Sequence, residues 1–152
     1  MGVRTFRDLR AWQAARQFKV AVYRLTDAGS LSKDDRLRSQ IREAAASAAS
    51  HISEGFGRFD PADFARFVKM ARASLIECQN HLDDAVDRGH ITEADRKEHD
   101  DMAQDALKEI GGLLDYLQSP EAKRNAERLR QKRVDRRNRR SNTEPGTSNS
   151  EP

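Results

Sequence analysis

The sequence predicts an all-α protein, an antiparallel up-down four-helix bundle with a basic C-terminal extension. Charged residues make up 35% of the chain and aromatic residues only 6%, a balance typical of long solvated helices. Apolar residues recur at three- and four-residue spacing in four segments, and strand-like alternation is absent. The length of 152 residues fits one domain, so we expect the four helices to share one core.

The start of each helix is predicted by a capping pattern. A Ser, Thr or Asp accepts from an unpaired backbone N–H, and an Asp three residues later lies at the positive end of the helix dipole. Pro61 follows one of these caps, at a helix position where proline is tolerated. The four pairs are Thr5/Asp8, Ser32/Asp35, Asp60/Asp63 and Thr92/Asp95.

An apolar stripe follows each cap, and the connections between the stripes are short, at about residues 27–31, 55–60 and 89–91. Short connections force successive helices to run antiparallel. We expect a bundle domain over 1–118, a basic arm over 119–140 and a disordered tail over 141–152. The stripes comprise Leu9, Trp12, Ala15, Phe18, Val22 and Leu25; Leu37, Ile41, Ala44, Ala48 and Ile52; Phe64, Phe67, Ala71, Leu75, Cys78 and Leu82; and Ala103, Ala106, Ile110, Leu113 and Leu117.

The stretch SEGFGRFD at 53–60 contains two glycines one residue apart. A phosphate-binding loop needs a strand ahead of it, whereas this stretch follows a predicted helix. We therefore interpret Gly55 and Gly57 as a helix-to-helix turn with a left-handed glycine cap. Arg58, directly after them, is expected to be exposed and able to meet an anion.

The segments QIREAAASAASHISEGFGR and FARFVKMARASLIEC, with FRDLRAWQAARQFKVAVYRLT near the start, resemble the 23S rRNA intervening-sequence proteins. That family of four-helix bundles includes the accessory variability determinants of diversity-generating retroelements. The resemblance covers about residues 5–118 and implies a homopentameric ring without enzymatic activity, associated with structured nucleic acid or a reverse transcriptase. The matching positions are Phe6, Asp8, Leu9, Trp12, Tyr23, Gln40, Arg42, Glu54, Gly55, Gly57, Arg58, Phe64, Phe67, Ser74 and Glu77.

The second helix has no charged residue between Ala44 and Ser53. Small residues on all sides let another helix approach closely, so this segment is a candidate subunit contact. The alternative is that alanine only supplies helix propensity on a bare surface. The candidate interface residues are Ala46, Ala49, Ser50 and Ser53.

Charge is distributed unevenly along the chain, whose net charge is +3. Residues 1–24 carry six bases and one acid, whereas residues 80–105 carry nine acids and three bases. In an up-down bundle the two groups fall at opposite ends. The bases expected to converge at one end are Arg4, Arg7, Arg10, Arg58, Arg66, Lys69 and Arg72.

The segment 123–140 carries ten bases and two acids and should leave the bundle at the same end. Such a segment is typical of a phosphate-backbone binder; the alternative is a solubilising tail. With few apolar residues to pack, we expect the arm to be mobile and to become helical when bound. The candidate nucleic-acid contacts in the arm are Arg128, Arg130, Lys132, Arg133, Arg136, Arg137, Arg139 and Arg140.

The sequence offers no convincing catalytic or metal site. His51 with Glu54, and Glu77 with His81, have the wrong order or spacing for a carboxylate-bridged metal site. Cys78 lies on an apolar stripe and is interpreted as a core residue. We therefore expect no metal, no cofactor and no enzymatic activity.

A single cysteine and a charged N-terminal segment predict a cytoplasmic protein, and no membrane anchor is expected. The leading hypothesis is a homo-oligomer that binds nucleic acid, RNA in preference to DNA, through the basic end and the arm. The alternative is an accessory scaffold that binds a reverse transcriptase in a diversity-generating retroelement.

Overall fold

The computed structural model describes residues 2–141, and every regular element in this range is helical. The all-α prediction is therefore confirmed. Two short 3₁₀ turns, η1 and η2, flank the first long helix. The elements are η1 (Phe6–Asp8), α1 (Arg10–Thr26), η2 (Ser30–Lys33), α2 (Asp35–Phe56), α3 (Pro61–Asp87), α4 (Glu93–Leu117) and α5 (Pro120–Ser141).

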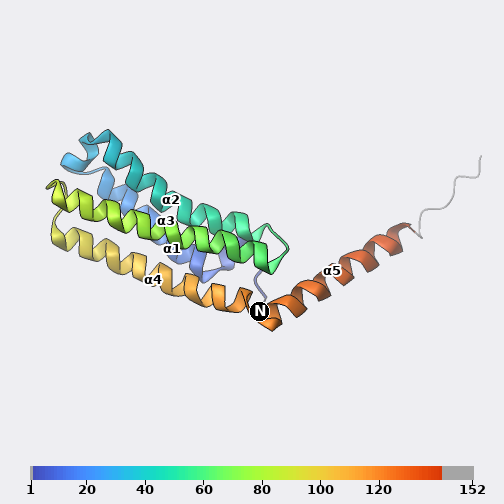
Figure 1. Cartoon of the computed structure of the whole chain (residues 1–152). Helices are drawn as coiled ribbons and strands as arrows, with labels where there is room; N and C mark the ends of the chain where they lie inside the picture. The colour runs from blue at the N-terminus through green and yellow to red at the C-terminus, as the bar shows by residue number, and fades with distance from the viewer. Residues whose placement is uncertain (1, 142–152) are drawn as a thin grey trace, which may run out of the picture.

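Helices α1–α4 lie side by side as one unit, and α5 leaves this unit at an angle (Figure 1). Both α1 and α3 contact α2 and α4, so each of these four helices has two neighbours among the other three. The start of α1, the α2–α3 connection and the end of α4 meet at one end, which we call the basic pole (residues 4–10, 56–69 and 113–119). The α1–α2 and α3–α4 connections meet at the opposite end, the acidic pole (residues 27–36 and 83–101).

One hydrophobic core runs through the α1–α4 unit. Phe18 of α1, Leu37 and Ile41 of α2, Leu75 of α3 and Ile110 of α4 are fully buried in it. The stripes predicted for α2 and α3 are buried along their whole length. The members of the other two stripes that only partly enter the core are Trp12, Leu25 and Leu113.

Two of the predicted capping residues start the helices they were expected to start. Thr92 Oγ1 accepts from the Asp95 amide at 3.1 Å, and Asp95 Oδ2 accepts from the Thr92 amide at 3.0 Å. Asp60 Oδ1 accepts from the amides of residues 62 and 63 at the start of α3. These backbone hydrogen bonds hold the pKa of Asp60 and of Asp95 below the usual range.

The other two capping predictions need correction. Asp34, not Ser32, caps α2, because its Oδ1 accepts from the Leu37 amide at 3.1 Å. Ser32 instead donates to the backbone carbonyl of Gly29, the residue directly before η2. Asp8 Oδ2 accepts from the Thr5 amide at 2.9 Å, but this pair closes η1, and α1 begins only after it.

The glycine pair also differs from its prediction. Gly55 is a buried residue inside α2, and a Cβ atom there would lie 2.5 Å from Phe64 Cδ2 and 2.8 Å from Phe67 Cβ. Gly57 caps α2 with φ of −70°, so the expected left-handed cap is wrong. Positive φ values occur instead at Gly29, between α1 and α2, and at Gly89, between α3 and α4. The segment is a helix-to-helix turn, and Gly55 allows α2 and α3 to approach closely.

The arm is a helix that makes few packing contacts. Ser119 Oγ accepts from the Ala122 amide at 3.3 Å, and Ala122 is buried against the α1–α4 unit. From Glu127 onward every described residue of α5 is exposed. The arm, expected to be mobile and to become helical when bound, is helical in this structure. Apart from Ser141, the tail predicted to be disordered lies outside the described residues.

Candidate nucleic-acid interface

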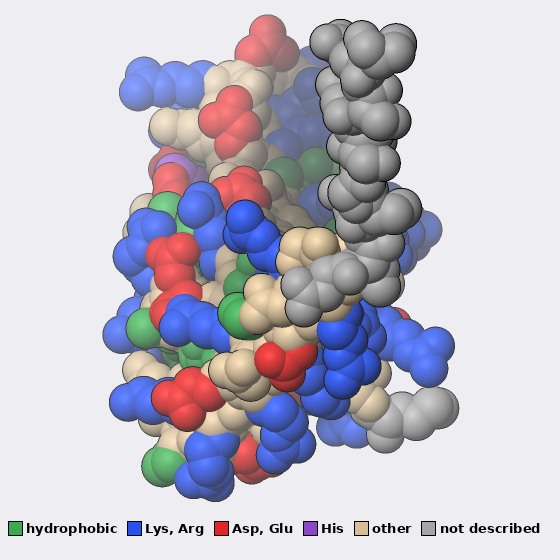
Figure 2. Space-filling model, turned by 90° about the vertical axis from the view of Figure 1, so that its right-hand side faces the viewer, with side chains coloured by type: hydrophobic (Ala, Val, Ile, Leu, Met, Phe, Trp, Pro, Cys, Tyr) green, Lys and Arg blue, Asp and Glu red, His purple; other side chains and the backbone are tan. Residues whose placement is uncertain are grey.

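Most of the predicted basic residues of α1–α3 lie around one end of the molecule. Arg7 and Arg10 come from the start of α1, Arg58 from the α2–α3 connection, and Arg66 and Lys69 from the first turns of α3. Figure 2 shows Lys and Arg side chains gathered around this end, with fewer acidic side chains between them. Arg72 is the eleventh residue after Pro61, about 16 Å along α3, so it lies on the flank of the unit.

Phe67 supports two of these arginines. The guanidinium carbons of Arg58 and Arg66 lie 4.9 and 4.7 Å from the centre of the Phe67 ring. Asp63 accepts from Arg66 at 2.9 Å and lies 3.8 Å from Arg58. The two cations are therefore held in position and share one carboxylate, which leaves a net positive charge on this part of the surface.

On the N-terminal side of the basic pole, an arginine also lies over an aromatic ring. The guanidinium carbon of Arg7 lies 4.5 Å from the centre of the Phe6 ring, and that ring packs edge-on against Trp12. Gln13 Nε2 donates to the backbone carbonyl of Arg7 at 2.9 Å. Within the described range, no ion pair is formed by Arg7, Arg10, Lys69 or Arg72, so these four cations are available to an external anion.

The first half of α5 is attached to the α2–α3 connection. Arg130 Nη2 lies 3.2 Å from Asp60 Oδ2, and the Arg133 guanidinium carbon lies 3.8 Å from the centre of the Phe59 ring. Asn125 donates to the Tyr116 hydroxyl at 3.2 Å. Asp60 therefore both caps α3 and holds the arm.

The second half of α5 projects away from the unit (Figure 1). At 100° per residue, the bases between 123 and 140 point to all sides of the helix. A helix that is basic on every side has no apolar face to bury against the protein. It is instead suited to a surrounding set of phosphates. The predicted contacts in the exposed part of α5 are Arg128, Arg130, Lys132, Arg133, Arg136, Arg137, Arg139 and Arg140.

The acidic pole carries more acids than bases, and three of its cations, Arg88, Arg96 and Lys97, are engaged in ion pairs. Arg88 binds Asp84 at 2.9 Å and Asp34 at 3.3 Å, and His90 Nε2 lies 3.1 Å from the same Asp34 carboxylate. The hydrogen bond from the Leu37 amide and these neighbours lower the pKa of Asp34. Because acids outnumber bases here, the acidic pole repels the anionic ligands that the basic pole attracts.

The comparisons with known proteins bear on this architecture. A family model described as 23S rRNA-intervening sequence protein matches residues 7–112. The chain belongs to this family. The matched range contains α1–α3 and most of α4 and ends before α5, so the arm lies outside the part that defines membership.

A solved structure also resembles this chain in fold. It is the 1.70 Å crystal structure of a protein of unknown function from the S23 ribosomal protein family of Bacteroides thetaiotaomicron VPI-5482. The TM-score is 0.58 at 17% identity, over 72% of this chain and 99% of that chain, a likeness that concerns the fold. No curated protein matches the sequence.

The positions that carry the family resemblance have structural roles. Arg42 of α2 lies over the Tyr23 ring at 4.4 Å and binds Asp27 at 2.9 Å, which ties α1 to α2. Gly55 fits against Phe64 and the neighbouring phenylalanine of α3. These contacts fix the relative positions of the helices at both poles, and so position the basic surface.

The four predicted interface residues divide into two groups. Ala49 is 3% exposed and packs inside the core of its own chain, so its side chain is not available at the surface. Ser50 is exposed, and Ala46 and Ser53 are partly exposed. These three remain the predicted subunit contact.

The His/Glu pairs weighed in the sequence lie on α2 and α3. His81 Nε2 lies 3.5 Å from Glu77, and Glu54 accepts from the Ser50 hydroxyl. The part of the chain that the structure describes contains no group of three or more potential metal ligands. Cys78 is fully buried, which confirms it as a core residue, and burial raises the pKa of its thiol to about 12.

Among the helices in the described range, none is long and apolar enough to cross a membrane. Sequence reasoning missed three residues at the basic pole: Phe59 and Tyr116, which are exposed, and Asp60, whose second role is to bind the arm. An aromatic residue in the short GRFDP turn was the one available signal for Phe59.

Proposed function

We propose that this protein binds structured RNA, without catalysing a reaction, through the basic pole and the arm. The proposal depends mainly on one observation, that the arm joins the α1–α4 unit at the basic pole. A helix with ten bases and two acids over 123–140 leaves the protein where Arg7, Arg10 and Lys69 also lie. Lys and Arg that neutralise phosphates release condensed counterions, which drives binding.

RNA is favoured over DNA for two reasons. The family description refers to 23S rRNA, and arginine-rich segments are a recurrent means of recognising structured RNA. The acidic pole limits how RNA can approach, because its carboxylates would face the phosphates. The proposal therefore predicts binding at one end of the protein only.

The test compares two triple variants of the full chain that change net charge equally. In the arm variant, Lys132, Arg136 and Arg137 become Gln. In the control variant, the exposed Lys33, Arg36 and Lys97 at the acidic-pole side become Gln. Affinity for a labelled RNA hairpin is measured for both variants and the parent over a series of salt concentrations.

Each phosphate contact contributes about 0.7–0.9 to the slope of log affinity against log salt concentration. Loss of three contacts should therefore flatten the slope by about 2–3 in the arm variant and leave the control variant like the parent. Equal effects of the two variants would show that net charge alone matters and would contradict a localised interface. If the parent protein binds no RNA at moderate salt, the RNA proposal is wrong and a protein-binding scaffold, such as a reverse-transcriptase partner, takes its place.

We also propose that α1–α4 form an up-down four-helix bundle that assembles into a homopentameric ring. The neighbour relations of the four helices support the bundle. The exposed small residues around Ser50 on α2, with Met70 and Ile76 exposed on adjacent α3, support a contact between copies. A ring would bring several arms together and raise avidity for RNA.

The assembly proposal is tested with two separate variants, each of which introduces one glutamate at a different position of α2. Ala46→Glu should lower the particle mass measured by light scattering, because it puts a charge into the predicted contact. Ser39→Glu, at an exposed position of the same helix, should leave the mass unchanged. A parent mass of one chain, or equal masses for all three proteins, would contradict the proposed contact.

A further inference from the structure

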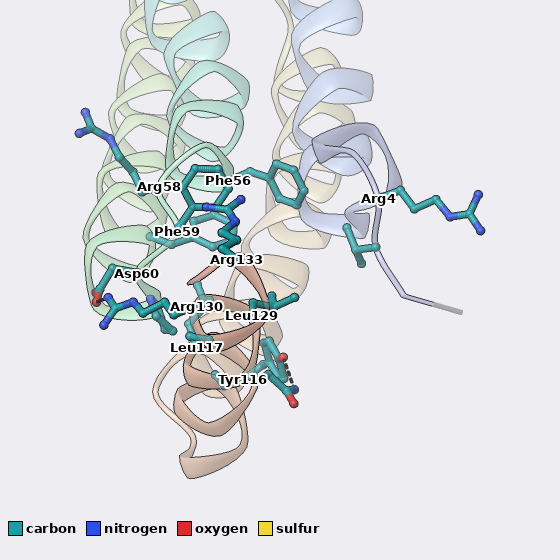
Figure 3. A pocket seen from close by; sticks show the side chains of 16 residues that line it. Arg4, Phe56, Arg58, Phe59, Asp60, Tyr116, Leu117, Leu129, Arg130 and Arg133 are labelled. Carbon is teal, nitrogen blue, oxygen red and sulfur yellow. Dashed lines mark hydrogen bonds and ion pairs between the residues drawn. The ribbon is translucent and has the colours of Figure 1, made fainter. Parts of the chain in front are cut away.

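A hollow of about 390 Å³ lies between the basic pole and the first half of α5 (Figure 3). The α2–α3 connection forms one wall, and the end of α4 and the start of α5 form the other. Its volume lies in the range of roughly 300–1,000 Å³ that is usual for sites that hold a small organic group. We call it the arm hollow.

Exposed apolar side chains gather in the arm hollow. Phe59 is 67% exposed, Leu129 is 61% exposed and Tyr116 is 44% exposed. These three and Val3 are four of the seven large hydrophobic residues that are exposed in the described range, and all four line the hollow. Such clustering marks a binding site rather than scattered surface residues.

The rim of the arm hollow is positively charged. Arg133 lies over one face of the Phe59 ring, and Arg130 is held by Asp60, the single acidic residue among those that line the hollow. Arg4 and Arg58 also line it, and Figure 3 shows their guanidinium groups pointing outward, away from the cavity. The hollow thus combines an apolar floor with cations that can reach an anion outside it.

We propose that the arm hollow receives one unpaired base of a bound RNA, stacked on Phe59, while the rim arginines contact the flanking phosphates. This inference rests on the proposed RNA binding and specifies its ligand as an RNA with an accessible unpaired base. Arg133 covers one ring face, so the base stacks on the other face. Aromatic residues beside basic grooves hold bases of single strands in this way, with little dependence on base identity.

Charge and shape favour this occupant over an apolar segment of a protein. Four arginines and one carboxylate surround the hollow, and the arm beside it carries a net charge of +8 over 123–140. An apolar protein segment would gain nothing from these cations, whereas a nucleotide supplies both an aromatic face and a phosphate. A fully paired duplex keeps its bases stacked, so it can use the arm but not the hollow.

The test uses the full chain and two RNAs. One is a hairpin with 2-aminopurine in its loop, and the other is a duplex of equal length with 2-aminopurine in a paired position. The variant Phe59→Leu keeps an apolar side chain without an aromatic face, and Phe59→Tyr keeps the ring as a matched control. Affinity, salt dependence and 2-aminopurine fluorescence are measured, and melting curves check that both variants fold like the parent.

Loss of stacking on one aromatic residue should weaken binding of the loop RNA by about 5- to 150-fold. We expect this loss for Phe59→Leu and not for Phe59→Tyr, with duplex affinity and salt slope unchanged. The fluorescence of the loop base should change on binding to the parent and not to Phe59→Leu.

Equal affinity of the parent and Phe59→Leu for the loop RNA would overturn the stacking site while leaving RNA binding in place. Equal weakening for loop and duplex would overturn it as well, because the effect would not depend on an unpaired base. A lower particle mass for Phe59→Leu would overturn the stacking site and identify the hollow as a contact between copies. Displacement of the loop RNA by free AMP, at an AMP concentration similar to that of the RNA, would overturn it too and assign the hollow to a mononucleotide. If neither RNA binds the parent protein, the proposed function itself fails.

Discussion

Replacing Gly55 by alanine should destabilise the protein, although alanine is the better helix former. The added Cβ would lie 2.5 Å from Phe64 Cδ2 and 2.8 Å from Phe67 Cβ. The Phe67 Cβ atom is fixed to the α3 backbone, so relief requires the two helices to separate. Overpacking of this kind costs about 1–3 kcal/mol, and the gain in helix propensity returns up to about 1 kcal/mol. The expected net loss in the free energy of unfolding is therefore up to about 2 kcal/mol.

Gly112→Ala is the matched control, because Gly112 also lies inside a helix but a Cβ there would meet no atom within 4 Å. It should stabilise the protein by about 0.5–1 kcal/mol. The helix propensity term cancels in the difference between the two variants, which leaves the packing cost alone.

Urea denaturation followed by circular dichroism at one fixed protein concentration measures both free energies of unfolding. A difference of about 1–3 kcal/mol would separate the melting temperatures by roughly 2–12 °C in a chain of this length. If the free energy of unfolding of Gly55→Ala equals that of Gly112→Ala, the inferred close packing of α2 against α3 at Gly55 is wrong.

Two further predictions concern the helix caps. Thr92→Ala should lower the free energy of unfolding by about 1 kcal/mol in urea denaturation, and Thr92→Ser should not, because serine keeps the capping hydroxyl; equal losses would contradict the cap. The pKa values of Asp34, Asp60 and Asp95 are lowered from 3.8 in the folded state, so their contribution to stability is present above pH 4 and lost as the pH falls below it. Melting temperatures should hence be insensitive to these groups between pH 7 and 5 and should fall below pH 4, whereas a main loss between pH 7 and 5 would contradict this assignment.

Local signals in the sequence predicted most of the fold. The apolar spacing of α2 and α3 placed their buried faces correctly, and the Thr92 cap and Pro61 marked two helix starts. The start of α2 was misplaced because Ser32 and Asp34 are both side chains that can cap a helix. The choice depends on where η2 ends, and a capping pattern does not contain that information.

The parts that the sequence did not predict depend on contacts between distant residues. Gly55 is a packing residue because of where Phe64 lies across the α2–α3 interface, and a lone glycine near a helix end has the same local pattern as a cap. The Arg130–Asp60 ion pair joins residues 70 positions apart, so no spacing rule indicates it. The convergence of bases at one pole was predictable because it follows from helix order alone, but the arm hollow requires side-chain positions.

The localisation of RNA binding to one end of the molecule is tested most directly by amide hydrogen exchange with and without a bound RNA hairpin. The exposed helix α5 has little packing to protect it and should exchange rapidly in the free protein. The account predicts that RNA slows exchange over residues 56–69 and 120–141 and leaves residues 83–101 at the acidic pole unchanged. Protection confined to the acidic pole, or spread evenly over α1–α4 with none in α5, would contradict it.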